Sequence, residues 1–164
     1  MKKYLLLISV LLFASCSLSN RTMGHKVQVS ERFITDTIDG FYIPVDLDDC
    51  FKQIDGFWND STKTEIQNWS EDELIANTHF GFGMWIRNNW CLWGGSRLSK
   101  YFNDLGIFHP DDMSSIILTS YHRYLNGEEI RLQEQIDHIK AYWLEMQEPE
   151  RKSYPKGVYR RDVK

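Results

Sequence analysis

The chain has 164 residues and a formal net charge of −4, from 19 Lys and Arg against 23 Asp and Glu. This length suits one domain with its own core and is too short for two comfortable ones. The acidic balance offers no electrostatic attraction to nucleic acid, whose binding depends on neutralising phosphates. Six tryptophans in so short a chain require a large core, a binding surface, or both.

The first residues have the form of an export signal. Lys2 and Lys3 precede an apolar run at 4–13, and two small residues then lead directly to Cys16. The run is shorter than the roughly 20 residues of a membrane-spanning helix, and the pattern is typical of a signal peptide. The small residues before a cysteine resemble the bacterial lipoprotein signal, which implies cleavage before Cys16 and acylation of that cysteine with palmitate or related chains. Simple secretion and an uncleaved anchor are the alternatives.

An acylated Cys16 predicts a cell-envelope protein held to a membrane by its lipid. Residues 17–20 carry no acidic side chain, which favours the periplasmic face of the outer membrane over the cell surface. Cleavage removes Lys2 and Lys3 and no acid, so 17 basic and 23 acidic side chains remain in the mature chain, a net charge of −6. The predicted organisation is a signal peptide at 1–15, a tether at 16–31, a mainly helical domain at 32–147 and a basic flexible tail at 148–164. The tail either contacts anionic lipid or an acidic partner, or is a solvated end.

The predicted domain begins with residues 32–43, which are rich in Phe, Ile, Thr and Tyr and hold Asp39-Gly40 in the middle. Asp-Gly between such residues is a hairpin signal. A short β-hairpin is therefore predicted here, with an extended lead-in as the alternative.

From Pro44 onward every strong signal is helical, and about five to six helices are predicted in one compact domain. The expected starts are marked by capping residues or by proline at the first turn, and they lie at Asp46, Thr62, Ser70, Ser96 and Pro110. The last helix carries an apolar stripe with steps of four and three residues and is expected to end at Pro149. That stripe consists of Leu132, Ile136, Ile139, Trp143 and Met146.

The segment at 79–98 is the least ordinary part of the chain. Gly81 and Gly83 each cost about 1 kcal/mol in a helix, so they suggest close backbone packing or a bend. One interpretation is a pocket or groove with aromatic walls and polar groups at its base, for a protein or small-molecule ligand. The other is a core filled by tryptophans, with the polar residues capping backbone. The candidate binding residues are Trp85, Arg87, Asn88, Asn89, Trp90, Trp93 and Arg97.

Catalytic patterns are weak. His109, Asp111 and Asp112 could share a proton or bind a metal, but the same residues are explained as a helix start. Ser96 follows two glycines without the G-x-S-x-G pattern of a nucleophile turn. No catalytic residue, metal site or cofactor is therefore predicted. Cys50 and Cys91 form either one disulfide in an exported protein or two buried thiols.

Several runs of this chain resemble a bacterial family catalogued only as a domain of unknown function. They are FGFGMWIRNNWCLWGGSRL at 80–98, HPDDM at 109–113 and YHRYL at 121–125. The resemblance covers about residues 42–130 and implies no activity. The predicted function is a membrane-anchored, non-enzymatic binding module. The alternatives are an envelope hydrolase using His109, Asp111 or Asp112 with Arg87 or Arg97, and a purely structural lipoprotein.

Overall fold

The computed structural model describes residues 29–153, with side chains from 31 to 146. The predicted signal peptide, Cys16 and most of the predicted tether lie outside the described residues, as do residues 154–164 of the predicted tail. The elements, in chain order, are α1 (Val29–Arg32), β1 (Thr37–Ile38), β2 (Phe41–Tyr42), α2 (Leu47–Phe57), α3 (Asp60–Gln67), α4 (Glu71–Thr78), the π-helix η1 (His79–Gly83), α5 (Met84–Asn89), α6 (Arg97–Asp104), α7 (Pro110–Leu125) and α8 (Leu132–Ser153).

This architecture confirms the predicted mainly helical domain with a short N-terminal hairpin. If α4, η1 and α5 are counted as one continuous helix and the one-turn α1 is set aside, residues 29–153 contain six helices. In the hairpin, Thr37 pairs with Tyr42 and Ile38 with Phe41. Asp39 and Gly40 make the turn with φ values of 50° and 85°, as a two-residue hairpin loop requires.

Most helix starts were predicted correctly because a cap is a local interaction. Asp46 accepts the backbone N–H of Asp49 at 2.9 Å, and Ser70 begins α4 with a complete capping box. Ser96 caps α6, and Pro110 occupies the first turn of α7. Each capping side chain accepts a backbone N–H that has no partner within the helix. Pro110 fits the first turn because it has no N–H that would need a partner.

Two predicted boundaries are wrong. α3 begins at Asp60, because Asn59 caps it by accepting the N–H of Thr62 at 2.9 Å; Thr62 is therefore inside the helix. α8 continues through Pro149 to Ser153. A proline removes one hydrogen bond from a helix and crowds the preceding turn, but this cost does not forbid the helix from continuing.

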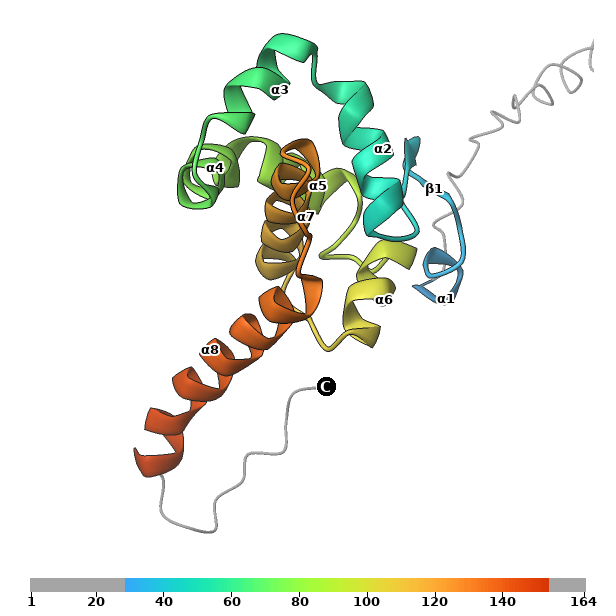
Figure 1. Ribbon diagram of the computed structural model, residues 1–164. Coiled ribbons are helices and arrows are strands. Elements are labelled where there is room, and N and C mark those ends of the chain that lie inside the picture. Colours follow the sequence, from blue (N-terminus) through green and yellow to red (C-terminus); the bar gives the residue numbers. More distant parts are fainter. Residues whose placement is uncertain (1–28, 154–164) are drawn as a thin grey trace, which may run out of the picture.

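α7 is the central helix of the domain. It contacts α2, α3, α4, η1, α5, α6 and α8, and Figure 1 shows it surrounded by the other helices. Its buried side chains include Met113, Ile117 and Tyr121. Tyr124 is 48% exposed, because it lies in the last turn and its ring stacks on Phe51 at the edge of the core.

The two unusual glycines lie in η1, inside the continuous helix α4–η1–α5. A Cβ on Gly83 would lie 3.2 Å from the Thr78 carbonyl oxygen and 3.5 Å from Leu118. Gly83 is thus explained by the close approach of the Thr78 backbone, and close backbone packing is one of the two predicted reasons. A Cβ on Gly81 would meet nothing within 4 Å, so packing does not explain that glycine.

α8 leaves the body of the domain and projects away from it (Figure 1). Ile136 is 2% exposed, whereas every side chain from 141 to 146 is exposed. Among the described residues, no helix is both long and apolar enough to cross a membrane.

Candidate functional site

The predicted binding segment is divided between the core and the surface. Trp90 is 1% exposed and belongs to the core. Trp85 is half-buried, with its ring stacked on Phe82 at 5.6 Å and edge-on to Phe57 at 4.8 Å. These two tryptophans therefore follow the core-filling alternative.

Arg87 is a buried structural cation. Its Nε pairs with Asp111 at 2.9 Å, Nη1 donates to the Ser114 hydroxyl at 3.0 Å, and Nη2 donates to the His79 carbonyl at 3.0 Å. Every nitrogen of the guanidinium is thus used within the chain, and the side chain is only 6% exposed. Arg87 joins η1 and α5 to α7 instead of facing a ligand.

The two asparagines take part in backbone interactions. Asn89 donates from Nδ2 to the Trp85 carbonyl at 2.9 Å, which stabilises the end of α5. Asn88 is exposed, and its carbonyl accepts the N–H of Cys91 at 3.3 Å. Only Asn88 leaves its side chain on the surface, so the pair does not form the polar base of a pocket.

Arg97 attaches the hairpin to α6. Its Nε donates to the Ile43 carbonyl at 2.7 Å, and its guanidinium lies 5.0 Å from the centre of the Tyr42 ring. The Tyr42 hydroxyl in turn donates to Asp49 at 2.7 Å. Arg97 therefore positions the N-terminal end of the domain.

Cys50 and Cys91 are free thiols, so the disulfide alternative is wrong. Their surroundings differ. Burial in α2 raises the pKa of the Cys50 thiol well above its ordinary value, and Asp49 and Asp46 add to this. Cys91 is half-buried, and the charges that act on it are those of Arg32 and Asp39.

Trp93 is the one predicted binding tryptophan that lies on the surface, with 59% of its area exposed. Its ring centre is 5.5 Å from that of His109, and the His109 ring is 5.9 Å from Trp143. Trp143 contacts Tyr142 at 5.5 Å. These four residues, Trp93, His109, Tyr142 and Trp143, form a continuous aromatic array.

The array is held in place and extended by its neighbours. The Nε1–H of Trp143 donates to Asp112 at 2.7 Å, which orients the indole. Phe108, next to His109 in the chain, is 73% exposed. The sequence interpretation missed Tyr142 and Trp143, since Trp143 fits the apolar stripe of a core helix. Only the exposed fraction distinguishes it, at 40%.

The residues of the hydrolase alternative are only partly brought together. His109 accepts the N–H of Asp111 as the cap of α7, at 3.3 Å, and its Nδ1 is 3.7 Å from the Asp111 carboxylate. Asp111 pairs with Arg87, Asp112 with Trp143, and Arg97 with the hairpin. Each of the five groups thus has a structural role. Within the described residues no group of three His, Cys, Asp or Glu could hold a metal ion.

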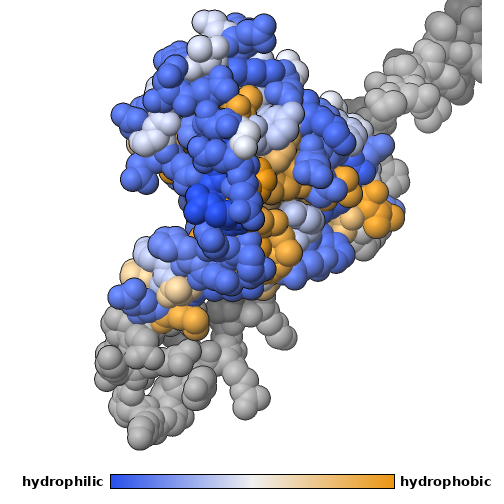
Figure 2. Space-filling view, in the orientation of Figure 1, coloured by the Kyte–Doolittle hydropathy of each residue, from blue (hydrophilic) through white to orange (hydrophobic). Residues whose placement is uncertain are grey.

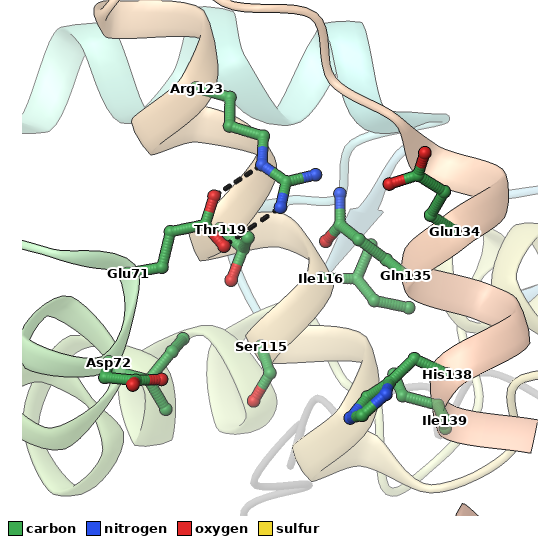
Figure 3. A pocket seen from close by; sticks show the side chains of 11 residues that line it. Glu71, Asp72, Ser115, Ile116, Thr119, Arg123, Glu134, Gln135, His138 and Ile139 are labelled. Atoms are coloured by element: carbon green, nitrogen blue, oxygen red, sulfur yellow. Dashed lines mark hydrogen bonds and ion pairs between the residues drawn. The ribbon is translucent and has the colours of Figure 1, made fainter. Parts of the chain in front are cut away.

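An open cavity of about 510 Å³ lies elsewhere, between α4, α7 and α8. Figure 2 shows the surface hollowed at this place, with strongly hydrophilic side chains around it. The lining residues are Glu71, Asp72, Ile75, Ser115, Ile116, Thr119, Arg123, Glu134, Gln135, His138 and Ile139, and Figure 3 shows them from close by. None belongs to the aromatic array.

No curated protein and no solved structure matches the chain. One family model matches residues 43–125, just over half of the 164 residues. The match runs from the end of the hairpin to the end of α7, so it contains Trp93 and His109 and leaves out α8. The chain belongs to this family, which is described as a domain of unknown function (DUF6794).

Proposed function

We propose that this chain is a lipid-anchored protein of the cell envelope whose helical domain binds a protein partner through the aromatic array. One observation carries the proposal: Trp93 and Trp143, 50 positions apart in the chain, flank the same histidine ring and are both left exposed. A tryptophan whose ring stays in water contributes little of the favourable free energy that burial of the ring would give. Two exposed tryptophans that flank one histidine ring are typical of a surface that another molecule covers.

The composition of the array favours a protein over other ligands. Tryptophan and tyrosine dominate the residues that contribute most to protein interfaces. The rings of Trp93 and His109 meet edge to face at 81°, and those of Tyr142 and Trp143 at 76°. These rings therefore do not form one flat stacking platform for a sugar. The cavity between α4, α7 and α8 offers no such platform either, since its lining contains no tryptophan, tyrosine or phenylalanine.

The proposed anchor rests on the sequence of residues 1–16. Several acyl chains on Cys16 would hold the protein permanently, since each buried methylene contributes about 0.8 kcal/mol and two chains suffice. The tether at 16–31 then lets the domain meet a partner near the membrane, on the periplasmic face of the outer membrane. Acyl labelling tests this part. A Cys16→Ala chain should lose both label and membrane attachment, and a variant that kept both would refute the anchor.

The hydrolase alternative has less support, because each of its candidate groups already has a structural partner within the domain. The purely structural alternative requires buried tryptophans, and Trp93 does not meet that requirement. Neither alternative accounts for the exposed rings.

Site-specific crosslinking in intact cells tests the binding surface. A photo-reactive phenylalanine analogue is placed at Phe108, beside the array, and in a second chain at Phe80, which is 79% exposed but belongs to η1. We expect one discrete protein adduct from position 108, its loss on Trp93→Ala, and no such adduct from position 80. An adduct that survives Trp93→Ala, or the absence of any adduct at 108, would contradict the proposal.

A further inference from the structure

The apolar stripe of α8 is buried over its first half only. Ile136 belongs to the core, and Ile139 is half-buried against it. The next two members of the stripe, Trp143 and Met146, are 40% and 54% exposed, and Tyr142 beside them is 51% exposed. Figure 1 shows the reason, since α8 runs past the body of the domain here. A helix gains most of its stability by burying such a stripe, and the outer half of α8 lacks that packing.

The exposed part of the stripe continues into the aromatic array and makes one apolar surface with it. This surface consists of Trp93, Phe108, Tyr142, Trp143 and Met146. Their exposed fractions of 40–73% leave on the order of 500 Å² in water, taking roughly 200 Å² for each whole side chain. A homodimer interface of standard size buries about 800 Å² of each partner, of which about 65% is apolar. The apolar area of this surface therefore matches what a stable dimer needs.

The charge of the chain changes sign along α8. Residues 31–146 carry 9 Lys and Arg against 20 Asp and Glu, a formal net charge of −11, whereas residues 148–164 carry 6 against 3, a net charge of +3. The acidic body lies at the N-terminal end of α8, and the basic residues lie at its C-terminal end and beyond. Two copies with parallel α8 helices would bring like charges together, which is unfavourable. Antiparallel helices would bring the basic end of each copy to the acidic body of the other.

We propose that the partner of the aromatic array is a second copy of this chain, bound with the two α8 helices antiparallel. This pairing rests on the proposed function, because the array is the surface in contact. One two-fold axis relates the copies, so each contributes the same surface. The outer stripes of the two helices cover each other, and Trp93 and Phe108 of each body contact the helix of the other copy. α8 has 22 residues and is about 33 Å long, so an overlap centred on Trp143 places the end of each helix beside the start of the other.

Two full-length copies with different affinity tags, expressed in the same cells, test the identity of the partner. Only the first copy carries the photo-reactive phenylalanine analogue at position 108. We expect its adduct to carry the second tag as well. An adduct with another protein and without the second tag would overturn this inference and leave the proposed function standing. The absence of any adduct would contradict the proposed function itself, and this inference with it.

Variants test the helix contact and its direction. Met146→Asp places a charge in the outer stripe and should lower the yield of the two-tag adduct by about tenfold or more. Met84→Asp, at a methionine of α5 that is 46% exposed, is the matched control and should give the wild-type yield. A wild-type yield from Met146→Asp would overturn the contact between the helices.

The double variant Arg160→Glu, Arg161→Glu tests the charge complementarity. It should lower the yield of the two-tag adduct by about threefold, because it weakens the attraction between the basic end of one copy and the acidic body of the other. Parallel helices predict the opposite, since the change would relieve repulsion between two basic ends. An unchanged yield, as expected if these arginines contact anionic lipid instead, or a raised yield would overturn the antiparallel arrangement.

Discussion

Trp143 donates its indole N–H to the carboxylate of Asp112 across 2.7 Å, and this bond ties α8 to the first turn of α7. The contact lies at the point where α8 leaves the body, since the side chains from 141 to 146 are all exposed. It also fixes one end of the aromatic array, because the same indole contacts His109. The proposed binding surface thus depends on a link between two helices, only one of which lies within the family match.

A double-mutant cycle of Asp112→Ala and Trp143→Phe should give a coupling free energy of about 1 kcal/mol, as expected for one hydrogen bond to a charged but accessible group. Each stability is measured by urea unfolding. The control cycle pairs Trp143→Phe with Asp48→Ala and should give no coupling. A coupling energy of zero in the first cycle would mean that the bond does not hold α8.

Alanine substitutions at the two glycines of η1 should change the free energy of unfolding in opposite directions. Gly83→Ala forces a Cβ against the Thr78 carbonyl and should lower the free energy of unfolding by about 1 kcal/mol or more. Gly81→Ala meets open space and should raise it by about 0.5 kcal/mol, because it restricts the unfolded chain. Thermal unfolding of both variants gives the answer, and shifts of the same sign would be inconsistent with the close approach of the Thr78 carbonyl to Gly83.

Arg87 should prove essential for stability. Arg87→Met removes the cation from three partners and deprives Asp111 of its guanidinium. We expect a loss of about 3 kcal/mol in the free energy of unfolding, the lower end of the range for a broken buried pair, because Asp111 is 37% exposed. The matched control is Arg131→Met, whose exposed pair with Glu134 should contribute about 0.5 kcal/mol or less. If the two variants unfolded at the same urea concentration, Arg87 would be free for another role.

Glu71 should contribute to the dependence of stability on pH. The hydrogen bonds from Arg123 lower the pKa of the Glu71 carboxyl, against the opposing effect of partial burial. A lowered folded-state pKa gives stability that is present above the unfolded pKa of about 4.3 and is lost as the pH falls through the folded value. The fall in unfolding free energy below that pH should therefore be shallower in Glu71→Gln than in the wild type. Glu65→Gln, at an exposed glutamate of α3, is the control. Parallel profiles of unfolding free energy against pH for Glu71→Gln and the wild type would contradict the role of Glu71.

The sequence predicted those parts of the fold that depend on neighbouring residues. The Asp39-Gly40 turn and the caps at Asp46, Ser70 and Ser96 each satisfy groups within a few positions, so local chemistry determines them. The errors at Thr62 and Pro149 each arose where one local signal did not decide a helix boundary. Asn59 offered a competing cap three residues earlier, and a proline lowers the stability of a helix without deciding where it ends.

The candidate site was predicted only in part, because it is assembled by tertiary contacts. Trp93 was among the candidates, but nothing near it in the sequence indicates that His109 and Trp143 lie beside it. Arg87 was a candidate for binding a ligand, but its guanidinium donates to Asp111 and Ser114, which lie more than 20 positions away in the sequence. Whether a tryptophan side chain is buried or exposed depends on such distant partners. Periodicity alone placed Trp143 on the buried face of its helix.

The most direct test of the account is the affinity of the partner that crosslinks at position 108 for three purified chains: wild type, Trp93→Ala and Phe80→Ala. Both substitutions remove an exposed aromatic ring, but only the first ring belongs to the array. If the array is the binding surface, Trp93→Ala should lower the affinity for the partner by about thirtyfold or more, the loss typical of a central interface tryptophan. Phe80→Ala should bind the partner with the affinity of the wild type. Equal affinities for all three chains, or equal losses in the two variants, would contradict the central claim.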